Sequence, residues 1–117
     1  MSRTIVTRRL LAALLLRRLA QSIDERAGYV IVDVNFAHVA LQSVPGAEAD
    51  AIKVLTGAGT AEWCRTRADE LDPRPTPSEL AESLFPPNAK RRPLAWDWDA
   101  AEQAIVAERK RVEGGAS

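Results

Sequence analysis

The stretch TRRLLAALLLRRLAQSIDERA, Thr7 to Ala27, decides the fold, because its apolar residues repeat with the spacing of a helix. At 100° per residue the apolar side chains share one broad sector and the charged side chains share the other. The pattern predicts an amphipathic helix from about Thr7 to Ala27, which Gly28 is well suited to end. The apolar sector holds Leu11, Ala12, Leu15, Leu16, Leu19, Ala20 and Ile23, and the polar sector holds Arg17, Arg18, Gln21, Asp24 and Glu25.

The first half of this helix is apolar on nearly all sides, because Leu10 and Leu14 fall on the otherwise polar side. One packing partner does not cover both sides of a helix, so we expect two buried faces. The second cover is either a later helix of the same chain or a second subunit. The sequence therefore leaves open a homo-oligomer formed through the first helix.

The next segment, GYVIVDVNFAHVAL from Gly28 to Leu41, is rich in β-branched and aromatic residues. This composition favours a short buried strand at 29–34, followed by Asn35 as the N-cap of a helix over 36–43. A strand needs a neighbour, and the candidates within the chain are the TIV segment at 4–6 and LAWDW at 94–98.

A single helix is the alternative for the same segment. Its apolar residues also fall on one helical stripe, so periodicity alone does not separate the two structures. The stripe consists of Tyr29, Val32, Phe36, Val39 and Ser43.

Turn and capping signals divide the following residues into short helices. Glu48 to Thr56 reads as a helix that carries Ile52 and Leu55, and the glycines at 57–59 end it. Thr60 is placed to cap a further helix that runs to Leu71.

Two capping boxes predict later helices. Thr76 and Glu79 open a short helix, and Asp99 and Glu102 open the last one, which Gly114 and Gly115 end. The chain is therefore predicted to be mainly α and to form one domain over 1–117. We expect a compact bundle of five or six helices with at most the short strand at 29–34, and a frayed tail from about 114.

Charge is balanced over the 117 residues but unevenly placed. Residues 1–26 carry six arginines and two acids, a balance of +4, whereas residues 27–72 carry seven acids and three cations, a balance of −4. A chain balanced in this way is not a general polyanion binder. We expect the basic N-terminal segment to face the acidic middle of the same chain or of a neighbouring copy.

Cysteine use and the N-terminal segment bound the location of the protein. Cys64 is the single cysteine and His38 the single histidine, so an internal disulfide and a thiolate zinc site are both excluded. The apolar run Leu10–Leu16 has seven residues before Arg17 stops it, too few for a secretory signal or a membrane span. The expected location is cytoplasmic, without a membrane partner.

Asp33 raises the question of a metal-dependent enzyme. The segment VIVDVNFAHVAL, 30–41, resembles the first strand and helix of a PIN-domain nuclease, in which a buried strand ends in Asp with Asn two residues later. The resemblance implies that Asp33 shares a divalent metal with further carboxylates. The parallel strands that would supply those carboxylates are not evident after Leu41. We therefore expect Asp33 at an exposed strand end or paired with an arginine of the first helix, and keep the PIN-like nuclease fragment as a third alternative.

The segment 48–71 has the helix, glycine turn and helix of a DNA-binding helix-turn-helix. Lys53 lies four residues before Gly57, where that motif wants a small buried residue. The second helix carries Glu62, Asp69 and Glu70 beside its arginines, a poor surface for phosphates. A DNA-associated regulator is therefore the second alternative.

The segment from Lys90 to Trp98 is the predicted partner-binding site. Its members are Lys90, Arg91, Arg92, Trp96 and Trp98. Prolines bar regular helix here, so we expect a surface loop, and Arg and Trp are the residues most enriched at binding hot spots. No nucleophile elbow or Cys–His pair is present. We expect a non-enzymatic protein without a cofactor that binds another protein, of the kind found among phage or mobile-element inhibitors and assembly components.

Overall fold

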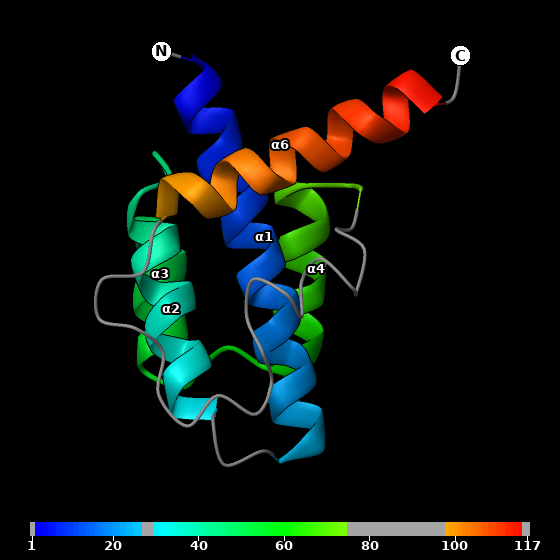
Figure 1. The fold of residues 1–117 in the computed structure, drawn as a ribbon. Coiled ribbons are helices and arrows are strands. Elements are labelled where there is room, and N and C mark those ends of the chain that lie inside the picture. Colours follow the sequence, from blue (N-terminus) through cyan, green and yellow to red (C-terminus); the bar gives the residue numbers. More distant parts are fainter. Residues whose placement is uncertain (1, 27–29, 75–97, 116–117) are drawn as a thin grey trace.

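Five helices make up the part of the chain that the structure, a computed structural model, describes, namely residues 2–26, 30–74 and 98–115 (Figure 1). The radius of gyration is 13.6 Å, the value of a compact chain of this length, about 13 Å. The predicted mainly α bundle is confirmed. The helices are α1 (Ser2–Glu25), α2 (Val30–Gln42), α3 (Glu48–Leu55), α4 (Ala61–Leu71) and α6 (Trp98–Gly115).

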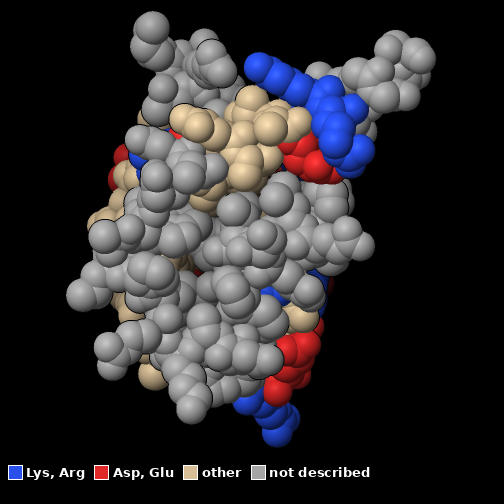
Figure 2. All heavy atoms as spheres, in the orientation of Figure 1, with Lys and Arg blue, Asp and Glu red and all other residues tan. Residues whose placement is uncertain are grey.

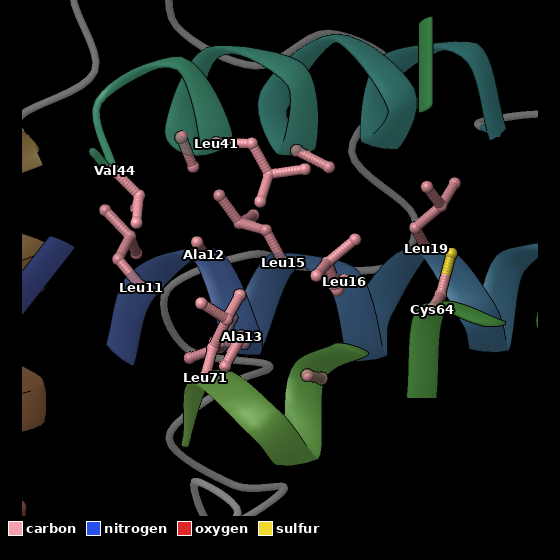
Figure 3. Close-up of a cluster of buried hydrophobic side chains, with 14 of the residues drawn as sticks. Leu11, Ala12, Ala13, Leu15, Leu16, Leu19, Leu41, Val44, Cys64 and Leu71 are labelled. Carbon is pink, nitrogen blue, oxygen red and sulfur yellow. The ribbon is translucent and has the colours of Figure 1, made fainter. Parts of the chain in front are cut away.

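α1 is the central helix, and it packs against α2, α4 and α6, while α3 packs on α2. Figure 3 shows Leu15 of α1 facing Leu41 of α2 and Leu11 beside Val44, with Leu71 of α4 on the other side of α1. Residues 11–16 are all buried, Leu14 included. The predicted two-sided burial of the first helix is therefore confirmed. The second cover comes from the same chain, so a second subunit is not needed to bury this helix.

The strand predicted at 29–34 was wrong, because α2 is one continuous helix from Val30 to Gln42. A lone strand would leave its backbone N–H and C=O groups without partners, whereas a helix satisfies them internally. The TIV segment at 4–6 lies within α1 and does not pair as a strand. Asn35, the predicted N-cap, is an exposed residue inside the helix.

The buried stripe of α2 also differs from the one predicted for the helical alternative. Phe36 is half-buried and Val39 is exposed. The residues that lie against the core belong to a neighbouring stripe at the same spacing. They are Asp33, Ala37, Ala40 and Leu41, with Val44 following the helix end.

Local signals predicted α3 and α4 correctly. Thr60 caps α4, and its hydroxyl oxygen accepts a hydrogen bond from the backbone N–H of Trp63 at 3.1 Å. Gly57 has a φ of +78°, which only glycine adopts without strain. A Cβ on Gly59 would lie 3.0 Å from Cε3 of Trp63, so this glycine lets the loop approach the indole.

α6 begins at Trp98, before the predicted N-cap Asp99. Glu102 therefore lies within the second turn, and its carboxylate pairs with Arg8 of α1. The helix predicted from Thr76 lies outside the described residues.

Candidate functional site

The predicted loop site lies almost wholly outside the described residues. Lys90, Arg91, Arg92 and Trp96 fall in 75–97, and Trp98 is the first residue of α6, with its side chain outside the description. The assignment of a partner-binding loop to this segment therefore stays a prediction.

The described arginines are used largely for ion pairs between helices. Arg17 Nη2 of α1 lies 2.9 Å from Oδ1 of Asp69 on α4, and Arg67 Nε lies 2.7 Å from Oδ2 of Asp50 on α3. Arg65 of α4 pairs with Asp24 of α1. Figure 2 shows basic and acidic atoms side by side where the described surface is visible. The predicted contact between the basic first segment and the acidic middle of the same chain is confirmed.

Asp72 is the most buried member of this ionic set, with 2 % of its surface exposed. Its carboxylate pairs with Arg109 of α6 and accepts from the backbone N–H of Arg74 at 3.1 Å. Its carbonyl oxygen accepts from Arg17 Nη2 at 2.6 Å. A single residue at the end of α4 thus links α1, α4 and α6.

Of the two positions expected for Asp33, an exposed strand end or a pair with an arginine of the first helix, the exposed end is wrong, because Asp33 is 1 % exposed inside the α1–α2 interface. The hydroxyl of Ser22 on α1 donates to its Oδ2. A PIN-like site requires the Asp at the end of a parallel strand, whereas Asp33 lies in a helix. In the part of the chain that the structure describes, no three His, Cys, Asp or Glu side chains are grouped as metal ligands.

The helices of the helix-turn-helix candidate pack on different neighbours. α3 packs mainly on α2 and α4 mainly on α1, and α3 contacts α4 through the ion pair of Asp50 with Arg67. Arg65 and Arg67, the cations of the second helix, are paired with Asp24 and Asp50. Phosphate binding at these arginines would have to break both ion pairs.

Exposed aliphatic side chains on α2 and α3 are the clearest described candidate for a binding surface. Ile31 and Val39 on α2 are 74 % and 43 % exposed, and Ile52 and Leu55 on α3 are 60 % and 51 % exposed. We call these four residues the α2–α3 face. The core-facing residues of α3 are instead Ala51 and Val54.

The sequence contained a signal for the α2 part of this face. Residues 31, 35 and 39 are spaced by four, so they share one stripe of α2 once the segment is recognised as a helix. The strand prediction hid this stripe, because it treated Ile31 as buried.

His38 and Cys64 have structural positions. His38 is half-buried, and its Nδ1–H donates to the carbonyl oxygen of Ala51 at 2.9 Å, which joins α2 to α3. Burial raises the pKa of the Cys64 thiol to about 11, so the thiol stays protonated at neutral pH and is a poor nucleophile.

Comparison with known proteins gives no family model, no curated protein and no solved structure that matches this chain. Among the described helices, none combines the length and apolar character needed to cross a bilayer.

Proposed function

We propose that this protein is a non-enzymatic binding module for another protein, and that the α2–α3 face takes part in the contact. The observation that carries the proposal is the exposure of four large aliphatic side chains on two adjacent helices. Single exposed aliphatic residues are ordinary, but apolar residues gathered on one face are typical of protein-binding surfaces.

The contact between α2 and α3 supports treating the four residues as one face. His38 of α2 is hydrogen-bonded to the carbonyl oxygen of Ala51 of α3. The next residue along each helix, Val39 on α2 and Ile52 on α3, therefore lies at the same height along the helix pair. On α3, Leu55 lies one turn after Ile52. On α2, Ile31 lies about two turns before Val39. Each of the two packed helices thus contributes two exposed aliphatic side chains.

The charge distribution favours a protein over nucleic acid. Arg17, Arg65 and Arg67 are held by carboxylates of the same chain, whereas nucleic acid affinity depends on cations that can replace condensed counterions on phosphates. We retain the segment Lys90–Trp98 as a second proposed contact, with Trp96 as its anchor.

Affinity capture with surface variants tests the proposal. The double variant Ile52→Ser, Leu55→Ser should lose a partner that the wild-type chain retains, because it removes both exposed aliphatic side chains that α3 contributes. Ala49→Ser, which changes an exposed residue of the same helix, is the matched control and should retain the partner. Equal capture by both variants would contradict a role for this face, and Trp96→Ala tests the loop separately.

A further inference from the structure

α6 is attached to the bundle differently from the other helices. It crosses α1, and its C-terminal end extends beyond the other helices (Figure 1). Of its side chains at 101–111, Ala101 and Ile105 are the buried apolar ones. Helix α1, by contrast, buries an unbroken apolar run from Leu11 to Leu16. Within the described side chains at 101–111, the apolar contribution to holding α6 is therefore small.

Among the described side chains, two ion pairs hold α6 at separate points. Near its start, Glu102 pairs with Arg8 of α1, with 2.6 Å between Oε1 and Nε. Two turns later, Arg109 pairs with Asp72 and also donates to the carbonyl oxygen of Arg74. The side chains of Glu102 and Asp72 are 9 % and 2 % exposed, so both contacts are largely shielded from water.

These ion pairs favour one position of α6 on the bundle. They add little to the free energy needed to separate α6 from the other helices. A buried ion pair gains Coulomb energy but loses the hydration of both charges, and the charges regain that hydration when the pair separates intact. Exposed apolar surface has no comparable compensation. Elements with few buried apolar contacts open at lower free energy than the core.

We propose that α6 is a strap that opens as a unit while α1–α4 stays folded, with Glu102 and Arg109 as its two attachment points. Opening exposes the buried apolar side chains Ala101 and Ile105 of α6, together with the part of α1 that α6 crosses. The strap thus controls access to apolar surface separate from the α2–α3 face, and the proposal does not depend on a role for that face.

Native-state hydrogen exchange of the full chain tests this proposal. The most protected amides of α6 should exchange at least about tenfold faster than the most protected amides of α1. If the two helices exchange together, at the rate of global unfolding, α6 is an integral part of the core and the proposal is overturned.

A matched pair of variants tests the attachment points. Arg109→Gln removes a contact to Asp72, whereas Arg111→Gln makes the same substitution in the same helix at a residue that pairs with Glu108 of that helix. Arg109→Gln should speed α6 exchange at least about tenfold and leave α1 protected, and Arg111→Gln should change it less than about twofold. Equal effects would overturn the assignment, and if Arg109→Gln does not fold, the exchange of the wild-type chain decides.

Discussion

Ser22 of α1 donates its hydroxyl hydrogen to the carboxylate of Asp33 on α2, within the apolar interface between the two helices. Both side chains are 1 % exposed. The hydroxyl oxygen of Ser22 also lies 3.1 Å from the carbonyl oxygen of Arg18, one turn earlier. The α1–α2 interface thus contains a polar contact that fixes the position of one helix along the other.

Removal of this contact should destabilise the chain. Ser22→Ala withdraws a donor from a buried carboxylate, which costs about 1.5–3 kcal/mol for a hydrogen bond to a charged group. Ser43→Ala is the matched control, because the Ser43 hydroxyl contacts the carbonyl of Val39 one turn earlier but is exposed. Urea denaturation of both variants gives the comparison. A loss no larger for Ser22→Ala than for Ser43→Ala would show that the Ser22–Asp33 contact contributes nothing.

Two leucine truncations separate the core from the α2–α3 face. Leu15→Ala, at a residue 1 % exposed, should lower the free energy of unfolding by about 2–5 kcal/mol. Leu55→Ala, at a residue 51 % exposed, should lower it by no more than about 0.5 kcal/mol. Denaturant titrations measure both, and a large loss at Leu55 would place that side chain in the core.

The loop between α3 and α4 should depend on its glycine at 57. Gly57→Ala places a side chain in the left-handed region at φ +78°, which costs about 1–2 kcal/mol. Ala58→Ser changes the next residue, which is exposed, and should leave the melting temperature nearly unchanged. Thermal unfolding followed by circular dichroism tests the pair, and equal melting temperatures would refute the strained position of Gly57.

The stability of the protein should fall in alkaline solution through Cys64. Burial raises the pKa of this thiol from 9.0 to about 11, so the unfolded chain loses the proton first. The contribution of the thiol is therefore fully present below about pH 9 and is lost as the pH rises toward 11. Cys64→Ala should show a shallower decline over this window in pH-dependent denaturation. A decline as steep as that of the wild-type chain would contradict the shifted pKa.

The sequence was most informative where the deciding interactions are local. The first helix, the break at 57–59 and the Thr60 N-cap depend on residues within one or two turns of one another, and all are present. The strand at 29–34 failed because β-branched composition does not reveal whether a neighbouring strand exists.

Long-range contacts account for the other differences. Arg18 was placed on the polar side of the first helix but is 5 % exposed, which the pattern of a single helix does not predict. A helical wheel of the first helix does not show Asp33, which accepts the hydrogen bond of the buried Ser22 hydroxyl. The α2–α3 face likewise depends on where α3 docks, which spacing within an eight-residue helix does not fix.

Site-specific photo-crosslinking in the cells that produce the protein tests its central claim most directly. A photoreactive residue at Ile52 should capture one defined partner protein, whereas the same residue at Thr66, exposed on the outer side of α4, should not. A product formed of two copies of this chain would mean self-association in place of a separate partner. No defined product at Ile52, or the same products from both positions, would contradict the proposal that the α2–α3 face binds another protein.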